Sequence, residues 1–292
     1  MRMKESVKKA LKSVVTTFSP ELTCRILFYS AFRRRLDTKN PKTLDEKLCT
    51  MKITEYAHHP LIPLCVDKYR VREYVTSKGL GSLLNECYAV YERPDDIDWE
   101  ALPQSFVLKC NHGCGYNILC PSKKDLDIPA ARRRLKRWMR EDYWRLNAEL
   151  NYRGIPKRII CEKYLCSEEH PVLKDYKVYC FHGKPYCMMV CVGRGEGKTR
   201  FYFFDPDWNL LRINPDSIAA PEGLTVEKPA GVREMFEYAR ILSEDFRFVR
   251  VDFFQVGEKI IFGEMTFTPA SGMDKNRLPE TDRLLGSMLH LD

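Results

Sequence analysis

The segment from Phe248 to Gly272 constrains the fold of this chain more than any other stretch. Two runs rich in β-branched and aromatic residues flank Gly257-Glu258-Lys259, and a glycine in a loop of this length is typical of a β-hairpin. If the turn is centred on Glu258, residues equally distant from it face each other. Asp252 then lies opposite Glu264, and Arg250 lies opposite Thr266.

The alternation of side chains along a strand predicts two different faces for this hairpin. One face carries Arg250, Asp252, Glu264, Thr266 and Thr268, whereas the other carries Val249, Val251, Phe253, Ile261, Met265 and Phe267. We therefore expect an apolar face in the core and a polar face that carries chemistry.

Two carboxylates that face each other across a strand pair have Cβ atoms only about 5 Å apart and repel each other unless a positive charge intervenes. Mg²⁺ binds one or two carboxylates together with substrate phosphates, so it suits an acidic pair beside hydroxyl groups better than zinc does. Two other interpretations stay open. The register differs by one residue, or Arg250 alone neutralises the pair on a solvent-exposed face.

The composition is that of an ordinary globular protein. The 292 residues are 44% hydrophobic and 30% charged, which predicts one large domain or two to three subdomains. No apolar run approaches the roughly 18 residues of a membrane-spanning helix, and the first residues lack a secretory signal. These features predict a cytoplasmic protein.

The 12 cysteines are scattered through predicted strands and helices, which favours reduced and mostly buried thiols. One cluster, Cys110-Asn-His112-Gly-Cys114 with Cys120, resembles half of a zinc knuckle. No second pair at ligand spacing follows it, so we do not expect a zinc site there.

The formal net charge of +8 favours anionic partners. The basic runs at 33–35 and 132–137 are typical of solvated helix faces, and no nucleic-acid motif accompanies them, so we expect no nucleic-acid partner. Residues 4–15 combine Val7, Leu11, Val14 and Val15 with four lysines in a basic amphipathic pattern. Such a helix either packs on the body of the protein or contacts an anionic membrane surface.

Local signals predict the remaining elements. Ser19-Pro20 begins a helix that runs to about Leu36, and the capping box of Thr43 and Glu46 begins another. Further helices are predicted at 66–75, 129–150 and 232–244, and strands at 88–91, 105–109, 118–120, 158–165, 175–181, 186–192 and 201–204.

Three segments could approach a phosphate group. Lys68 is predicted in the first turn of the helix at 66–75, where an anion is readily held, and Lys109 precedes a turn with Gly113 and Gly115. The loop 193–198 is basic and rich in glycine. A surface lysine, an ordinary hairpin turn and a surface loop are the alternatives that stay open.

Five segments, in sequence order, resemble the ATP-grasp superfamily and most closely its TupA-like branch, which is linked to teichuronopeptide and capsular polysaccharide synthesis. They are residues 67–70, 106–115, 161–165, 175–185 and 250–272. The resemblance implies an α+β ATP-grasp fold, in which two lobes with mostly antiparallel sheets clamp ATP. It implies an N-terminal helical region at 1–100, a small lobe at 101–165 and a large lobe with the Mg²⁺ site at 166–292.

The resemblance also implies roles for particular residues. Lys68 and Lys109 would contact phosphates under the turn of Gly113 and Gly115, and the adenine would be read by Glu162, Lys163, Tyr164 and Leu165. Asp175 would face ribose or phosphate, Lys177 and Arg250 would be catalytic, and Asp252, Glu264 and Thr266 would hold Mg²⁺. The usual Glu-x-Asn pattern is replaced here by Glu264-Met-Thr266, so the third ligand becomes a hydroxyl or a water. Ser271 and Gly272 are substrate-site candidates by position only.

The implied function is an ATP-dependent carboxylate–amine ligase that acts through an acyl phosphate in the biosynthesis of a capsule or cell-wall glycan. Its partners would be ATP, an acidic sugar or glycan precursor, and an amine such as an amino acid, for example joined to a uronic acid. The expected location is the cytoplasm, or the inner face of the cell membrane. The alternatives are a glycosyltransferase that uses a nucleotide sugar and a non-catalytic nucleotide-binding or membrane-docking scaffold.

Overall fold

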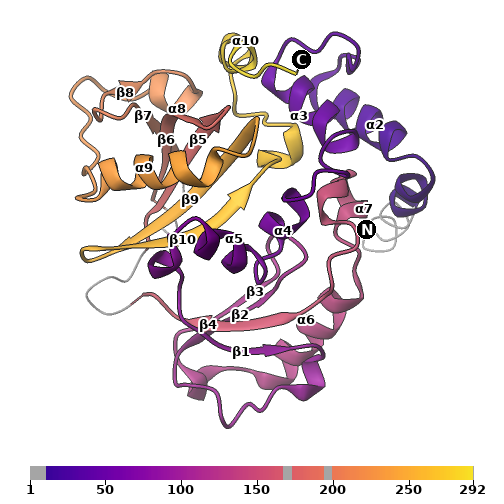
Figure 1. The fold of residues 1–292 in the computed structure, drawn as a ribbon, viewed down its shortest axis with the longest axis vertical. Helices are drawn as coiled ribbons and strands as arrows, with labels where there is room; N and C mark the ends of the chain where they lie inside the picture. The colour runs from indigo at the N-terminus through magenta and orange to yellow at the C-terminus, as the bar shows by residue number, and fades with distance from the viewer. Residues whose placement is uncertain (1–10, 167–172, 194–198, 292) are drawn as a thin grey trace.

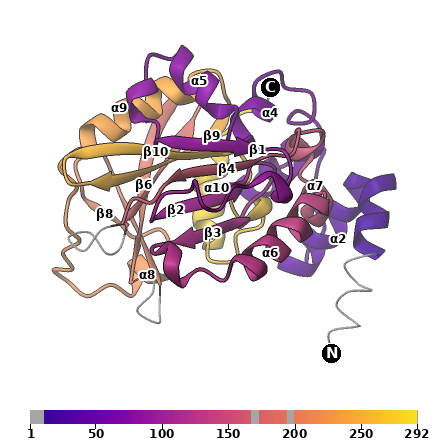
Figure 2. The same ribbon diagram turned by 90° about the horizontal axis from the view of Figure 1, so that it is seen from below.

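Two antiparallel sheets carry most of the residues that the sequence singles out. The computed structural model describes residues 11–166, 173–193 and 199–291. One sheet has four strands in the order β1-β4-β2-β3, and the other has six in the order β10-β9-β5-β6-β7-β8. Figure 1 shows the four-stranded sheet below the six-stranded one, and Figure 2 shows the same pair of sheets from below, with the smaller one towards the viewer.

The predicted strands are all present. The small sheet contains β1 (Cys87–Tyr91), β2 (Phe106–Cys110), β3 (Asn117–Cys120) and β4 (Ile159–Lys163). The large sheet contains β5 (Asp175–Phe181), β6 (Lys184–Val192), β7 (Arg200–Phe204), β8 (Leu210–Leu211), β9 (Phe248–Val256) and β10 (Lys259–Thr266). The division at residues 100 and 165 stays a prediction, and β1 is a member of the small sheet.

The helices surround these sheets. They are α2 (Pro20–Phe32), α3 (Leu44–Ile53), α4 (Ile62–Val66), α5 (Val71–Ser77), α6 (Ile128–Arg140), α7 (Trp144–Asn147), α8 (Pro215–Ile218), α9 (Val232–Ser243) and α10 (Pro279–Ser287). Residues 11–18 are helical, and the rest of the predicted basic helix, residues 4–10, lies outside the described residues. Ser19 accepts a hydrogen bond from the backbone of Leu22, and the capping box of Thr43 and Glu46 is confirmed.

Three predicted helices have different bounds in the structure. The helix predicted at 66–75 is wrong, because α4 ends at Val66 and α5 begins at Val71. The carboxylate of Asp67 accepts hydrogen bonds from the backbone of Tyr69 and Arg70, and this local capping competes with a continuous helix. The basic helix stops at Arg140 rather than near residue 150, and α2 stops at Phe32, where the next residue is left-handed with φ of 57°.

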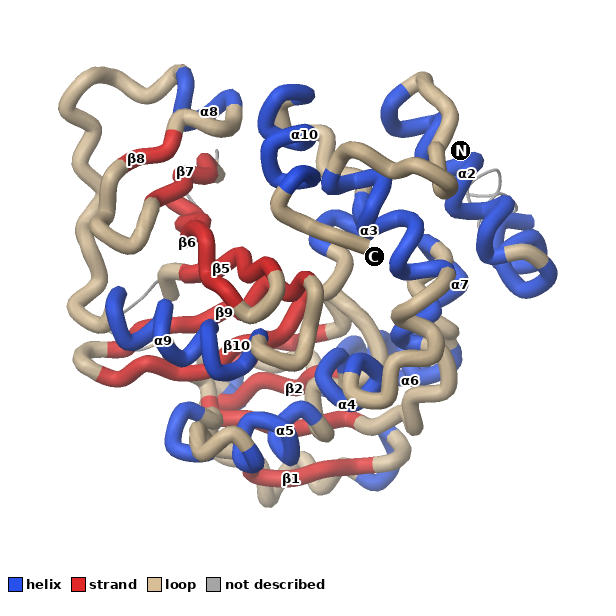
Figure 3. Tube along the Cα trace, turned by 45° about the horizontal axis from the view of Figure 1, so that its top comes forward, coloured by secondary structure: helices blue, strands red, loops and turns tan. Residues whose placement is uncertain are grey.

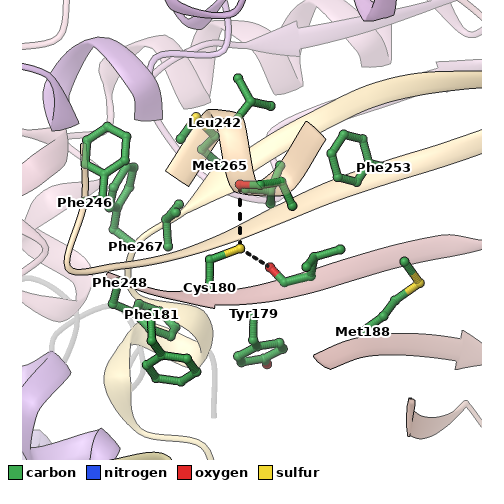
Figure 4. Close-up of a cluster of buried hydrophobic side chains, with 14 of the residues drawn as sticks. Tyr179, Cys180, Phe181, Met188, Leu242, Phe246, Phe248, Phe253, Met265 and Phe267 are labelled. Carbon is green, nitrogen blue, oxygen red and sulfur yellow. Dashed lines mark hydrogen bonds between the residues drawn. The ribbon is translucent and has the colours of Figure 1, made fainter. Parts of the chain in front are cut away.

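The largest core lies between α9 and one face of the six-stranded sheet. Val249, Val251 and Phe253 are completely buried there, as predicted for this face of the hairpin. The thiol of Cys180 on β5 donates to the carbonyl oxygen of Ala239 on α9 at 3.8 Å, as Figure 4 shows. Because α9 covers this face, the opposite face of the sheet is the one that carries the polar side chains.

The N-terminal and C-terminal helices pack against each other beside the two sheets (Figure 3). Lys47 of α3 donates hydrogen bonds to the carbonyl oxygens of Gly286 and Leu289 at 2.8 and 2.6 Å. Gly286 of α10 leaves no room for a Cβ atom, because that atom would collide with the backbone of residues 42–44. The helical N-terminal region is therefore anchored to the end of the chain.

The hairpin of β9 and β10 pairs Asp252 with Glu264 as predicted, but its turn and its register differ from the prediction. Lys259 pairs with Val256, so the turn contains two residues and is not centred on Glu258. A bulge at Gly263 then shifts the register by one residue, after which Glu264 pairs with Asp252. The predicted pairing of the two acids is confirmed, and a one-residue register error is excluded at this position.

The same bulge corrects one face assignment. Ile261 pairs with Phe254 and so lies on the face of Asp252, not on the apolar face. Phe262 takes the place in the core and is only 6% exposed. An added residue in one strand reverses the direction of every side chain beyond it, which simple alternation does not anticipate.

We predict that Gly263→Ala lowers stability by about 1–3 kcal/mol, the usual cost of forcing an extra methyl group into a packed site. The new Cβ atom would lie 2.9 Å from the backbone oxygen of Asp252 and 3.2 Å from the ring of Phe254. Urea unfolding measures the change. Gly81→Ala is the matched control, since its Cβ atom meets mainly the side chain of Thr76. Identical unfolding curves for wild type and Gly263→Ala would contradict this account of the bulge.

Candidate active site

Three cations neutralise the facing carboxylates of Asp252 and Glu264. Arg250 donates to Asp252 in a bidentate manner, with both N–O distances at 2.7 Å. Lys177 lies 2.5 Å from Asp252, and Lys68 lies 3.0 Å from Glu264. The interpretation that Arg250 alone neutralises the pair is therefore wrong.

Two further side chains complete this cluster. The hydroxyl of Thr266 accepts a hydrogen bond from Arg250 at 3.1 Å and lies 3.4 Å from Glu264. Asp175 is 3.7 Å from Lys177. The hairpin and the neighbouring strand β5 therefore bring together six predicted site residues, and Lys68 reaches them from the segment between α4 and α5.

Attraction between opposite charges opposes the effect of burial on the pKa values of Glu264 and Lys177. Attraction to Lys68 holds the pKa of Glu264 well below its usual range, although burial acts in the opposite direction. Burial by itself would lower the pKa of Lys177, but attraction to Asp252 raises it overall. With Arg250 always protonated, Lys68, Lys177 and Arg250 balance the three carboxylates of Asp175, Asp252 and Glu264.

This donor set fits Mg²⁺ accompanied by phosphates. Within residues 11–166, 173–193 and 199–291, no three His, Cys, Asp or Glu side chains gather closely enough to form a metal site by themselves. Asp252 and Glu264 with the hydroxyl of Thr266 supply two carboxylates and a neutral oxygen, which suits an ion that takes its other ligands from phosphate and water. Because the cluster is already balanced in charge, an added dication would need anions of its own.

The zinc-knuckle segment has a different role. Cys110 and Cys120 are buried in the core of the small sheet, where α6 covers the strands. The Nε2 atom of His112 lies 3.1 Å from the carbonyl oxygen of Trp138. These side chains pack the small sheet.

A second ion pair lies on the small sheet. Lys109 of β2 donates to Glu162 of β4 at 2.6 Å, and Arg72 of α5 lies 4.0 Å from the same carboxylate. Lys68, Lys109, Glu162 and Leu165 line one small cavity of about 30 Å³ between the two sheets. Four predicted nucleotide-site residues, from three separate segments, thus meet at one place.

Lys163 and Tyr164 are not among the residues that line this cavity. Lys163 is exposed and lies 4.0 Å from Glu86. Tyr164 is partly exposed and follows the end of β4. Their proposed contact with adenine stays a prediction.

The turn that contains Gly113 and Gly115 joins β2 and β3 as a hairpin. Gly115 has a φ of 75°, which favours glycine. Gly113 allows the ring of Tyr143 to approach, since a Cβ atom would lie 2.7 Å from it. The glycine-rich loop predicted to approach an anion lies mostly outside the described residues, at 194–198.

Sequence reasoning missed the network that positions Lys68. The side-chain amide of Asn111 donates a hydrogen bond to the carboxylate of Asp67 at 2.9 Å. The backbone carbonyl oxygen of Asn111 accepts a hydrogen bond from the backbone N–H of Lys68 at 3.2 Å. Both Asp67 and Asn111 are completely buried. No local pattern shows that an asparagine after β2 pairs with an aspartate 44 residues earlier.

A second buried network surrounds the substrate candidates Ser271 and Gly272. The hydroxyl of Ser271 donates to Glu149 at 3.1 Å and accepts from Asn147 at 2.9 Å. Burial raises the pKa of Glu149, and attraction to Lys52 opposes that effect. Ser271 has a left-handed φ of 58°, and this positive φ continues at Gly272 with 74°.

The family comparison gave one match that covers most of the chain. The model of the TupA-like ATP-grasp family matches residues 46–290. A search of the curated proteins found no match. Among the described residues, no helix combines the length and apolar character required to cross a membrane.

Several solved structures resemble this one at low sequence identity. D-Alanine–D-alanine ligase from Bacillus anthracis, complexed with ATP, has a TM-score of 0.46 and 13% identity over 77% of this chain and 61% of the ligase chain. The Helicobacter pylori ligase has a TM-score of 0.45 and 15% identity over 78% of this chain and 62% of that chain. The ATP-grasp ligase PsnB, complexed with a minimal precursor, has a TM-score of 0.42 and 11% identity over 83% and 68%. The aligned region spans about three fifths of the two D-alanine–D-alanine ligases.

We predict that Lys68→Met destabilises the protein at neutral pH and that this loss shrinks in acid. The pKa of Glu264 is lowered on folding, so its stabilisation is present above the unfolded value of about 4.3 and is lost as the pH falls further. Urea unfolding of both proteins between pH 7 and pH 3 measures the difference. Lys124→Met, at an exposed lysine outside the site, is the control. A difference that is independent of pH would contradict the assigned ion pair.

Proposed function

This chain belongs to the TupA-like ATP-grasp family, and on that premise we propose that it is an ATP-dependent carboxylate–amine ligase that acts through an acyl phosphate. The observation that carries the proposal is the facing pair of Asp252 and Glu264 with Lys68, Lys177 and Arg250 around it. Phosphoryl transfer requires positioned cations around a spreading negative charge more than it requires a nucleophilic side chain. Lys68, Lys177 and Arg250 are cations positioned in this way.

The nucleotide would lie between the two sheets. Lys68 and Lys109 would bind its phosphates under the turn of Gly113 and Gly115, and the segment from Glu162 to Leu165, with Lys163 and Tyr164, would contact adenine. Both lysines now hold carboxylates, at 3.0 and 2.6 Å, so phosphate oxygens would replace partners of the same charge. Because the cavity measures only about 30 Å³, ATP binding would also require the sheets to separate.

Asp252 and Glu264, with the hydroxyl of Thr266, would hold Mg²⁺. When bound, Mg²⁺ supplies positive charge that offsets the charge of the phosphate oxygens. Asp175 would face the ribose or a phosphate. Lys177 and Arg250 remain within reach of the transferred group, since both already lie within hydrogen-bonding distance of Asp252.

The reaction has two steps. An oxygen of the acceptor carboxylate attacks the γ-phosphorus, and the bond from that phosphorus to the ADP oxygen breaks. Lys177 and Arg250 stabilise the transferred phosphoryl group. The nitrogen of the amine then attacks the acyl carbon, phosphate leaves, and the amine loses a proton to solvent, which yields an amide.

We propose an acidic sugar or glycan precursor as the acceptor and an amino acid as the amine, in the cytoplasm and in the synthesis of a capsule or cell-wall polysaccharide. The net charge of +8 supports an anionic acceptor. The family resemblance supports the polysaccharide context. Nucleic acid is not part of this proposal.

An exposed apolar stripe supports peripheral contact with the inner face of the membrane. Leu11, Val14, Phe18, Leu22, Ile26 and Tyr29 recur every three to four residues along residues 11–18 and α2. Phe18 is 85% exposed and Leu11 is 64% exposed. Basic residues at 33–35 follow the stripe, and four lysines precede it or lie within it in the sequence. An apolar stripe with basic residues complements an anionic lipid surface.

We predict that Asp252→Asn abolishes ligase turnover, with a loss of about 100-fold or more, because one of the two carboxylates that would hold Mg²⁺ beside the phosphates is removed. ADP release is measured with Mg²⁺, ATP and a panel of uronic acids and amino acids. Asp95→Asn, at an exposed aspartate outside the site, is the matched control. Undiminished turnover in Asp252→Asn would contradict the assigned site.

The same protein preparation distinguishes the alternatives. A thermal-shift titration in which a nucleotide sugar stabilises the protein and ATP does not would support a glycosyltransferase instead. ATP binding without ADP release under any acceptor would support a non-catalytic nucleotide-binding protein.

We predict that Phe18→Asp combined with Leu22→Asp weakens binding to vesicles of phosphatidylglycerol about tenfold or more, because two apolar side chains leave the interface. Cosedimentation measures the bound fraction. Leu119→Asp, at a 60% exposed leucine of β3, controls for added charge. If the double variant and the control bind alike, the stripe has another role.

A further inference from the structure

A strained loop follows the hairpin that carries the acidic pair. Ala270, Ser271 and Gly272, shortly after the end of β10 at Thr266, have φ angles of 50°, 58° and 74°. The left-handed region is unfavourable for alanine and serine, because the Cβ atom crowds the following carbonyl oxygen. Strain of this kind persists only where neighbouring groups fix the backbone, and it gathers at functional sites. The contacts that fix this loop therefore bear on the function of the site.

The loop borders Arg250 but not the cavity proposed for the nucleotide. Pro269 and Ala270 line a second cavity, of about 230 Å³, together with Arg250. None of residues 268–272 lines the cavity proposed for the nucleotide. A movement of the loop should therefore alter the surroundings of Arg250 and spare the ATP site. The polar wall of the second cavity comes from the same segment and includes Asp274, Asn276 and Arg277.

One buried carboxylate ties the two ends of the loop together. Glu149 is 3% exposed and accepts hydrogen bonds from the hydroxyl of Thr268 at 2.6 Å and from that of Ser271 at 3.1 Å. Asn147 donates its side-chain amide to the same Ser271 hydroxyl at 2.9 Å. Because Ala270 lies between the two hydroxyls in the sequence, the carboxylate holds both sides of its left-handed backbone.

Helix α3 holds the same loop through backbone carbonyl groups. The completely buried ammonium of Lys52 donates to the carbonyl oxygen of Ser271 at 2.7 Å, and the thiol of Cys49 donates to that of Gly272 at 3.2 Å. Lys52 also attracts the carboxylate of Glu149. A buried ion is costly unless an opposite charge and hydrogen bonds offset the loss of water. An acid and a base from distant parts of the chain are thus buried at one loop.

We propose that Glu149, supported by Lys52, is a positioning residue of the ligase, which holds residues 268–272 in the conformation that binds the substrates other than ATP. Glu149 acts through the hydroxyls of Thr268 and Ser271 and does not itself touch the reacting atoms. This inference rests on the proposed ligase function. A carboxylate that only joined the segment after α7 to the loop would contribute to stability and leave substrate affinity unchanged.

Hydrogen exchange tests the hold on the loop without any substrate. The backbone N–H of Ser271 donates to the carbonyl oxygen of Thr268 at 2.8 Å, and that of Met273 donates to Ala270 at 3.1 Å, so these two amides report the turn. Thr268→Val keeps the shape of the side chain and removes its hydroxyl. We expect both amides of the full chain to exchange about tenfold faster in this variant, measured by mass spectrometry at single-residue resolution.

Thr23→Val is the matched control, because Thr23 is 2% exposed and its hydroxyl accepts a hydrogen bond from Thr16 at 3.1 Å outside the loop. In this control, the two amides should exchange at the wild-type rate. Glu149→Leu removes the acceptor of both hydroxyls and should accelerate exchange as well. If Glu149→Leu does not fold, Thr268→Val decides the result by itself. Wild-type exchange in Thr268→Val would overturn the proposal.

Turnover tests the effect on the substrates. With an acceptor and an amine that support ADP release by the wild type, Thr268→Val should raise the KM of at least one of them about fivefold or more, whereas the KM for ATP changes less than about twofold. Thr23→Val should leave all three KM values unchanged. A lower kcat with unchanged KM values in Thr268→Val would indicate a purely structural role and overturn the proposal.

The positioning role and the ligase function can fail separately. If the wild type releases ADP but the KM values of acceptor and amine are unchanged in Thr268→Val, the ligase function stands and the positioning role is wrong. If the wild type releases no ADP with any acceptor and amine, the ligase function fails. The positioning role, which rests on that function, then fails with it even when hydrogen exchange accelerates.

Discussion

The repulsion between Asp252 and Glu264 is the constraint on which the rest of the site depends. Two carboxylates on facing strand positions require nearby cations, and here these come from three places in the chain. Arg250 lies on the same strand as Asp252, Lys177 lies on the adjacent β5, and Lys68 comes from the link between α4 and α5. Electrostatic balance therefore joins the large sheet to a segment almost 200 residues away in sequence.

Backbone details make this arrangement possible. The bulge at Gly263 sets the register that aligns the two acids, and the pairing of Asp67 with Asn111 fixes Lys68 beside the end of β2. Lys109 and Glu162 form a similar ion pair on the small sheet, where the Lys109 ammonium lies 2.6 Å from the Glu162 carboxylate. Lys68 beside the large sheet and Lys109 on the small sheet are thus each paired with a carboxylate.

Local patterns predicted those parts of the fold whose partners are close in sequence. The hairpins of β5 with β6 and of β9 with β10 follow from alternation and from turn glycines, and the capping box of Thr43 and Glu46 is a four-residue signal. The prediction of a helix at 66–75 failed because the side chain of Asp67 hydrogen-bonds to the backbone two and three residues later. The segment after β10 gave no readable pattern, yet it forms the polar wall of the second cavity.

The sequence by itself determined the hairpin and the apolar face of β9, because these depend on strand period and on turn glycines. The two-residue turn and the bulge at Gly263, which together align Asp252 with Glu264, were decided by the tertiary structure. The sequence also identified Lys68, Lys109 and Glu162 as separate candidates. Only the tertiary structure decided that Lys68 meets Glu264, that Lys109 meets Glu162, and that Arg277 closes a cavity against Tyr179 and Phe203. Such contacts join segments that are far apart in the sequence, and their geometry is set by packing and burial that no local pattern encodes.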